Sequence, residues 1–218
     1  MPGPAAPLSS DAPPPPAAAA VPHVLLARRP HRPGPAVAFL PGLALACGRA
    51  HELCGPARRT LALMVAAALD GAVMWIRPAW MRETLNPAGM EGLVNPGRLI
   101  TVAAPRAEDL PWCAEEVLRA GVVALCVVEL PAPPALTAVR RLHLAAETGA
   151  REGRCVPLGL VLTPGEGGAA GVESRWHMAA AHRPGETRWR LSRRRARTAP
   201  PAQWWLVRRG RRLVPLPA

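Results

Sequence analysis

Apolar residues recur along this chain with two different spacings, and segments of the two kinds follow one another in turn. Short apolar runs bounded by glycine or proline are typical of buried strands. Longer segments with apolar residues three and four positions apart are typical of helices that pack on one face. The runs that predict strands are 50–54, 73–76, 99–102, 122–130 and 157–162, and the segments that predict helices are 60–69, 108–120 and 137–147.

Strands that alternate with helices indicate βαβ units, so we predict an α/β fold with a mostly parallel sheet flanked by helices. In the last predicted helix, Thr137 is a favoured N-cap and Gly149 a favoured stop. After Gly171 the pattern changes to strict alternation in 175–178 and 188–191, which are separated by a turn rich in proline and glycine. Together with 203–207, these segments predict antiparallel strands at the C-terminal end.

The composition of the chain changes near residue 35. Residues 1–35 are rich in proline and alanine and offer little to bury, which predicts a disordered arm. We expect a globular domain over 36–192 and a basic C-terminal tail, with room for one short strand, over 193–218. No apolar stretch reaches the ~18 residues of a membrane span, and the first residues lack the features of a signal peptide. We therefore expect a cytoplasmic protein with no membrane partner.

Positive charge is concentrated near the C-terminus. All 27 basic residues are arginine, and the net charge is +12. Twelve arginines lie between Arg175 and Arg212, where Glu186 is the only acidic residue. Such segregation favours an anionic partner, either nucleic acid or an acidic protein surface. The arginines that we predict to bind it are Arg188, Arg190, Arg193, Arg194, Arg195, Arg197, Arg208 and Arg209.

Tryptophans are interleaved with these arginines. Trp189, Trp204 and Trp205 could stack on single-stranded bases, but a tryptophan on a strand more often packs against its own sheet. We assign Trp75, Trp80 and Trp112 to the core or to the loops over it.

The segment 55–60 has part of the pattern of a phosphate-binding loop. In G-x-x-x-x-G-K-[ST], backbone N–H groups surround the phosphates, the lysine reaches their oxygens and the Ser or Thr holds Mg²⁺. Here only the two ends match, the segment is two residues shorter, and the second glycine and the lysine are absent. We call it the degenerate loop, and its residues of interest are Gly55, Pro56, Arg58, Arg59 and Thr60.

We expect the degenerate loop to have no ATPase activity and the protein to need no cofactor. Arg58 and Arg59 have two interpretations: they are screened by solvent at a helix N-terminus, or they contact a phosphate or an acidic partner. The spacing of the histidines, carboxylates and five cysteines predicts neither a metal site nor a catalytic set. The sequence therefore predicts a protein that is not an enzyme.

The strand, degenerate loop and helix around residues 48–63 resemble the phosphate-loop region of RecA. That resemblance implies a RecA-like fold. It places Glu129 where the family has an aspartate near Mg²⁺, and Arg77-Pro78 where the family offers a glutamate that orients water. At the level of a subfamily, the chain resembles the ImuA family in its alphaproteobacterial form. The segments that carry this second resemblance are 48–53, 55–60, 86–90, 136–142, 162–168 and 173–176.

Membership of the ImuA family implies an accessory role in error-prone translesion DNA synthesis during the bacterial SOS response. Its implied partners are an ImuB-type relative of Y-family polymerases and an error-prone DnaE-type polymerase, with RecA and single-stranded DNA as further candidates. An alternative is a SulA-like inhibitor of cell division that binds FtsZ, because that fold is also RecA-like. A residual nucleotide-binding enzyme is a third reading and the least favoured.

Overall fold

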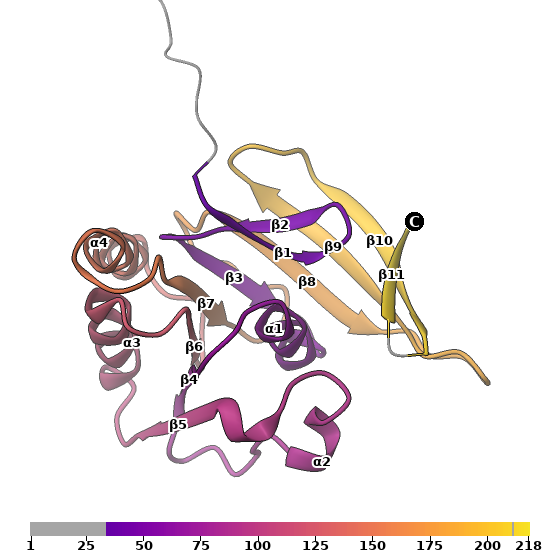
Figure 1. Ribbon diagram of the computed structural model, residues 1–218, viewed down its shortest axis with the longest axis horizontal. Helices are drawn as coiled ribbons and strands as arrows, with labels where there is room; N and C mark the ends of the chain where they lie inside the picture. The colour runs from indigo at the N-terminus through magenta and orange to yellow at the C-terminus, as the bar shows by residue number, and fades with distance from the viewer. Residues whose placement is uncertain (1–33, 211) are drawn as a thin grey trace, which may run out of the picture. The chain divides into compact units, whose positions relative to one another are not determined.

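The computed structural model describes residues 34–210 and 212–218 (Figure 1). Its largest element is a sheet of nine strands, of which the first six in chain order run parallel and the last three run antiparallel. The strands are β3 (Ala50–Cys54), β4 (Val73–Pro78), β5 (Leu99–Ala104), β6 (Leu125–Glu129), β7 (Leu158–Leu162), β8 (Ser174–Ala180), β9 (Arg188–Ala196), β10 (Ala202–Arg209) and β11 (Arg212–Pro217). Their order across the sheet is β11-β10-β9-β8-β3-β7-β6-β4-β5.

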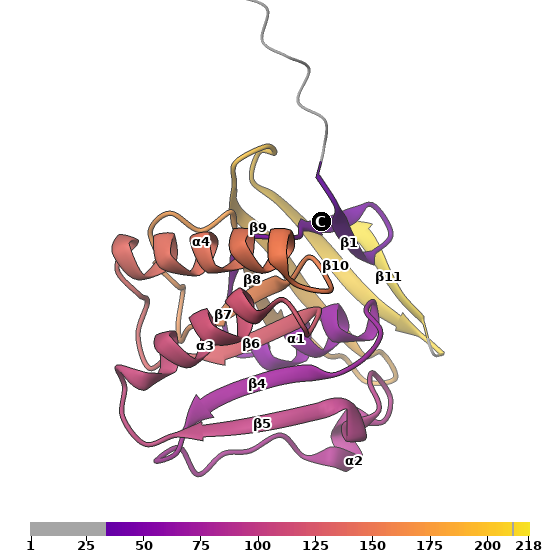
Figure 2. The same ribbon diagram turned by 60° about the vertical axis from the view of Figure 1, so that its left-hand side comes forward.

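The remaining elements lie on the two sides of this sheet (Figures 1 and 2). They are the hairpin of β1 (Ala36–Leu40) and β2 (Leu43–Ala46) and the helices α1 (Arg58–Ala67), α2 (Pro87–Met90), α3 (Asp109–Ala120) and α4 (Leu136–Glu152), with a 3₁₀ turn at Pro96–Arg98. One apolar core joins α1 and the hairpin to the sheet, and a second lies under α3 and α4. None of the helices in the described residues is long and apolar enough to cross a membrane.

The predicted α/β class, mostly parallel sheet and antiparallel C-terminal strands are confirmed. One predicted strand is too long at its start, because β6 begins at Leu125 and not at Val122. Gly121 ends α3 in the left-handed conformation, and Val122 in the following turn is 62% exposed. An apolar run therefore extended the prediction into a turn.

The prediction for the last helix is wrong at both ends. Its N-cap is Ala135 rather than Thr137, and α4 continues through Gly149 to Glu152. Gly149 lies where α4 meets the end of α3, and a Cβ at this position would stand 2.0 Å from the carbonyl oxygen of Leu118. The glycine therefore serves the close approach of two helices and does not stop the helix.

The predicted division at residue 193 is also wrong. β9 crosses it, and β10 and β11 extend the sheet, so residues 193–218 are not a tail. The side chains of Trp189, Leu191 and Leu206 are buried in the core beside α1. Alternation along the strands buries these apolar side chains and exposes the arginines between them. The many arginines are the reason that the composition predicted a basic tail for this segment. The predicted arm at 1–35 lies outside the described residues, except for residues 34 and 35.

The tryptophans divide between core and surface. Trp75 is 1% exposed and lies in the core, as predicted. Trp80 and Trp112 are 50% and 56% exposed and lie on the surface. The ring of Trp204 stacks on Trp176 at a centroid distance of 5.8 Å. Packing within the protein therefore accounts for Trp204, as it does for the buried Trp189.

A buried carboxylate on β3 connects this strand to the end of β7 and to β8. Glu52 of β3 is fully buried and accepts hydrogen bonds from the Thr163 hydroxyl at 2.7 Å and from the backbone N–H groups of Gly168 and Ala169 at 2.8 and 3.1 Å. The guanidinium of Arg175 on β8 forms an ion pair with it. Both oxygens are thus satisfied, as a buried charge requires.

The imidazole of His51 forms a second polar link on the other side of β3. Its Nδ1 is 2.6 Å from the Ser174 hydroxyl, and its Nε2 is 2.9 Å from the carbonyl oxygen of Ala46. Because a carbonyl only accepts, Nε2 carries the proton and Nδ1 accepts from Ser174, which itself accepts from the Trp176 indole. Burial lowers the pKa of His51 to about 4.

We predict that acid destabilises the fold partly through His51. Since the pKa of His51 is about 4 in the folded chain and about 6.5 in the unfolded chain, the unfolded state binds an additional proton between these values. The stability contributed by neutral His51 is therefore complete above pH 6.5 and is lost as the pH falls toward 4, by about 3 kcal/mol at most. Urea unfolding between pH 7 and pH 5 should show a shallower decline in His51→Gln than in the wild type. Parallel pH curves would contradict this account.

Candidate functional site

The degenerate loop follows β3 and leads directly into α1. Gly55 has a φ of +87°, which favours glycine. A Cβ there would also stand 2.5 Å from the carbonyl oxygen of Met178 and 2.7 Å from His177 Nε2. The loop is therefore pressed against β8, and any side chain at position 55 would displace it.

Backbone N–H groups of the degenerate loop donate to other parts of the protein. The N–H of Gly55 donates to Gly165 at 2.9 Å, and that of Ala57 donates to Met178 at 3.0 Å. Pro56 has no N–H, and the N–H of Arg58 donates back to Gly55 at 3.2 Å. A phosphate loop functions by directing such groups at the phosphates. Four consecutive positions here cannot do so.

Arg59, at the start of α1, pairs with the buried carboxylate of Glu129 at the end of β6. Its Nε donates to Glu129 Oε2 at 2.8 Å, and its Nη2 lies 2.8 Å from the same oxygen. The indole of Trp75 donates to the other oxygen, Oε1, at 2.8 Å. Glu129 is 3% exposed, so its charge is balanced almost entirely by protein donors. A cation held by this carboxylate would be repelled by Arg59, and the residues present do not fit the Mg²⁺ that a RecA-like ATPase needs.

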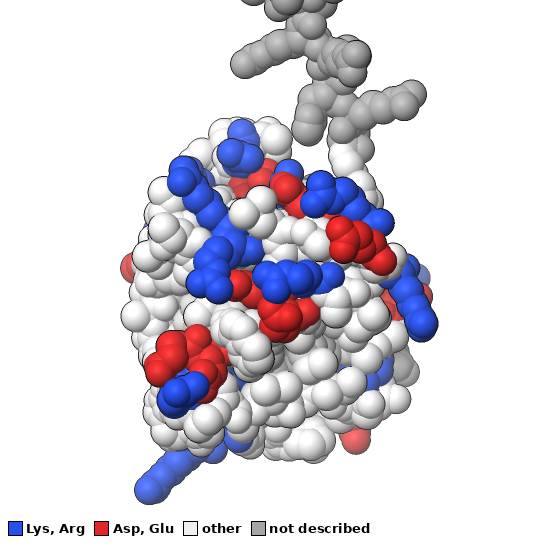
Figure 3. Space-filling model, turned by 90° about the vertical axis from the view of Figure 1, so that its left-hand side faces the viewer, with Lys and Arg blue, Asp and Glu red and all other residues white. Residues whose placement is uncertain are grey.

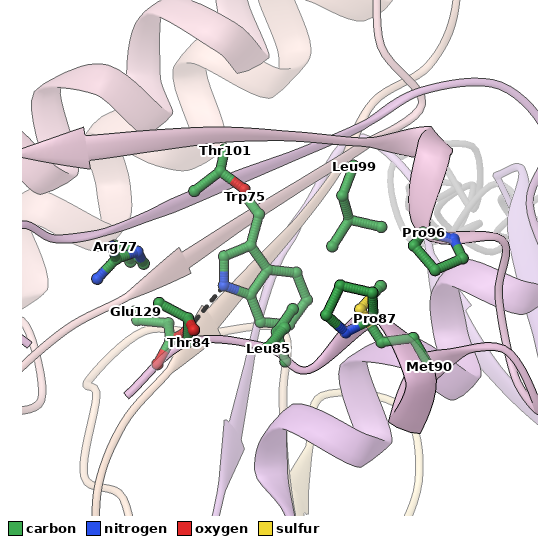
Figure 4. Close-up of a pocket in the computed structure, with 10 residues that line it drawn as sticks. All are labelled: Trp75, Arg77, Thr84, Leu85, Pro87, Met90, Pro96, Leu99, Thr101 and Glu129. Atoms are coloured by element: carbon green, nitrogen blue, oxygen red, sulfur yellow. Dashed lines mark hydrogen bonds between the residues drawn. The ribbon is translucent and has the colours of Figure 1, made fainter. Parts of the chain in front are cut away.

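A pocket of about 220 Å³ lies beside this ion pair (Figure 4). Trp75 and Glu129 form one wall, Leu99 and Thr101 of β5 another, and α2 contributes Met90. The volume is below the ~300 Å³ at which small-molecule sites usually begin. Arg77 also lines the pocket, and its Nη1 donates to the carbonyl oxygens of Pro78 and Met81 at 3.2 and 2.7 Å. An arginine held in this way cannot orient a water molecule as a glutamate would.

The other residues of the degenerate loop have mixed surroundings. Arg58 is half-buried and its Nη1 donates to the Gly55 carbonyl at 3.2 Å. Pro56 is exposed and Thr60 is half-buried. Arg59 fits neither of the two interpretations given for Arg58 and Arg59, because its acidic contact, Glu129, belongs to the chain itself.

The eight arginines predicted to bind a partner do not form one cluster. Arg193 and Arg208 lie on the core side of the sheet, Arg193 over the rings of Trp176 and Trp204 at 5.6 and 5.3 Å. The Nη2 of Arg208 donates to the carbonyl oxygen of Gly92 at 3.2 Å. These two arginines therefore have structural contacts of their own.

Three further arginines of the set have acidic neighbours. Arg194 pairs with Glu166 at 2.6 Å, Arg197 approaches Glu173 at 3.8 Å, and Arg188 approaches Glu186 at 3.5 Å. Arg190, Arg195 and Arg209 are exposed and have no acidic partner within ion-pair distance among the residues that the structure describes.

Sequence reasoning missed the pairs Glu52–Arg175 and Arg59–Glu129. The one signal for them was a glutamate within each of two apolar strands, since a buried carboxylate needs a partner. Within the described ranges, no group of three or more His, Cys, Asp or Glu side chains could hold a metal ion. All five cysteines are free, and burial raises the pKa of the Cys54 thiol to about 12, so that it is not a nucleophile at neutral pH.

We predict that the pair Arg59–Glu129 is important for stability. Arg59→Leu should lower the free energy of unfolding by about 3 kcal/mol, because it leaves a buried carboxylate with one donor. The double variant Arg59→Leu/Glu129→Leu should recover much of this loss in urea unfolding. The exposed pair of Arg106 and Asp109, 2.8 Å apart, provides the control, and Arg106→Leu should leave the free energy of unfolding almost unchanged because solvent screens this pair. Equal effects of Arg59→Leu and Arg106→Leu would contradict the prediction.

No protein-family model matches this chain, and no curated protein matches it. The features of this chain that bear on its function are the degenerate loop, the pair Arg59–Glu129 beside it and the distribution of arginines over the surface.

Proposed function

We propose that this protein is a non-catalytic, RecA-like accessory protein of error-prone translesion DNA synthesis in the bacterial SOS response. In this role it is an adaptor for an ImuB-type protein and an error-prone DnaE-type polymerase, with RecA as a further candidate partner. The observation that carries the non-catalytic part is the degenerate loop, whose N–H groups and neighbouring carboxylate are engaged by the chain itself. The role in translesion synthesis rests on the resemblance to the ImuA family.

The order of the strands supports the RecA-like part of the proposal. β3, which precedes the loop, is separated by one strand, β7, from β6, which ends in Glu129. The carboxyl ends of parallel strands meet at one edge of the sheet, so that the loop and this carboxylate face each other. In a RecA-like ATPase, a nucleotide and its metal ion would lie between the two groups. Here the side chain of Arg59 joins them.

Segments that resemble the ImuA family meet at the same edge of the sheet. The degenerate loop contacts the β7–β8 connection, since Gly55 donates to Gly165. The start of α4 reaches the same connection, because a Cβ at Gly171 would stand 2.5 Å from Leu136 Cδ1. These segments are distant in the sequence and adjacent in space, which supports a shared surface for partners.

Affinity capture from DNA-damaged cells tests the adaptor role. We expect the tagged chain to recover an ImuB-type protein and a DnaE-type polymerase after damage, because an adaptor must bind both. The control is the same capture from undamaged cells, in which the SOS partners are not induced. Loss of the gene should also lower damage-induced mutagenesis. Recovery of FtsZ without any polymerase component, or unchanged mutagenesis, would contradict the proposal.

A further inference from the structure

The three antiparallel strands β9, β10 and β11 have one face in the core and one face open. Cross-strand pairing places Arg190 opposite Trp205 and Trp205 opposite Leu216, so that these three side chains share one side of the sheet. The pairs on either side of this row lie on the same side. We call this surface the open face, and it consists of Arg188, Arg190, Ser192, Gln203, Trp205, Val207, Arg209, Arg212, Val214 and Leu216. Ser192 and Val207 are buried among their neighbours on this side.

No helix packs on the open face in the part of the chain that the structure describes. α1 and the β1–β2 hairpin lie on the opposite side of these strands, and α3 and α4 cover only the parallel strands (Figures 1 and 2). Arg190 and Arg209 are exposed, Trp205 is half-buried and Leu216 is 38% exposed. The open face is thus a sheet surface with apolar side chains at its centre and arginines around them.

The open face carries four arginines, of which Arg188 has an acidic neighbour, Glu186 at 3.5 Å. No acidic residue follows Glu186 in the sequence. Arg190, Arg209 and Arg212 have no acidic group within ion-pair distance among residues 34–210 and 212–218. The surface over α3 and α4 differs, because arginine and glutamate are intermingled there, as in the pairs Arg119–Glu116 and Arg141–Glu115 (Figure 3). Unbalanced charge on the open face calls for an anionic partner.

The flat groups of the open face favour a nucleic acid over an acidic peptide. The guanidinium of Arg188 lies over the Trp205 ring at 4.6 Å. Indole and guanidinium planes on a sheet are surfaces on which unpaired bases stack, while neighbouring arginines contact the phosphates. The sheet edge does not favour a peptide, since Pro215 and Pro217 of β11 lack the N–H groups that an added strand would use.

We propose that the open face binds single-stranded DNA, with bases stacked on Arg190 and on the guanidinium of Arg188 where it lies over the Trp205 ring, and with phosphates at Arg209 and Arg212. The stacking and the phosphate contacts would suit RNA as well, and the choice of DNA rests on the proposed function. The site itself does not depend on the polymerase partners. Binding to purified protein can therefore fail or succeed independently of the capture experiment.

The test is fluorescence anisotropy of a labelled fifteen-residue oligo-dT with the full-length chain at several salt concentrations. Arg209→Ser/Arg212→Ser should weaken binding about tenfold at low salt and reduce the salt slope by about 1.4, because each of the two lost phosphate contacts on a single strand contributes ~0.7. Both side chains are exposed, and the variant should fold. The matched control is Arg140→Ser/Arg151→Ser on α4, which removes the same charge from exposed positions and should bind like the wild type.

Three outcomes would overturn the proposal. The first is that the wild type does not bind oligo-dT at about 50 mM salt, a concentration low enough to favour phosphate contacts. The second is that the open-face variant and the α4 control bind equally well. The third is that oligo-rU or a poly-glutamate peptide binds more tightly and is not displaced by oligo-dT.

Discussion

The carboxylate of Glu52 lies on β3, next to β8, the strand from which the antiparallel part of the sheet extends. Its hydrogen bonds reach the end of β7, the β7–β8 connection and β8. One buried charge therefore positions three consecutive segments that are distant from Glu52 in the sequence. Because β9, β10 and β11 are added to the sheet through β8, the placement of the arginine-bearing strands depends on the same contacts. Removing one partner of such a buried pair typically costs about 3–5 kcal/mol.

Arg59 and Glu129 repeat this arrangement at the end of β6. In both pairs a glutamate on a central strand is balanced by an arginine of the chain, at an edge where α/β proteins usually bind ligands. The donors that a bound nucleotide would require are thereby used to hold the fold together. The charge of the surface is unbalanced on the open face of β9, β10 and β11, which is where we propose that a partner binds.

The sequence predicted the repeating strands and helices because local patterns determine them. Ala50–Cys54 and Asp109–Ala120 are examples, since an apolar run or a helical stripe is visible without knowledge of the rest of the chain. Tertiary contacts determined what was missed. Gly149 continues a helix because of Leu118 on its neighbour, and Arg59 finds Glu129 seventy residues away. The segment 203–207 predicted part of β10, whereas β11 was not predicted among the arginines of this region. The division of these arginines between core side and open face depends on the register of the strands.

The chain's own groups fill the site in which a RecA-like ATPase would hold its nucleotide. Isothermal titration of the purified protein with Mg-ATP measures whether a nucleotide still binds there. We expect no saturable binding at micromolar ATP, because the loop N–H groups donate to carbonyl oxygens and Arg59 pairs with Glu129. Low-micromolar affinity, with ATP turnover that Thr60→Ala abolishes, would contradict it.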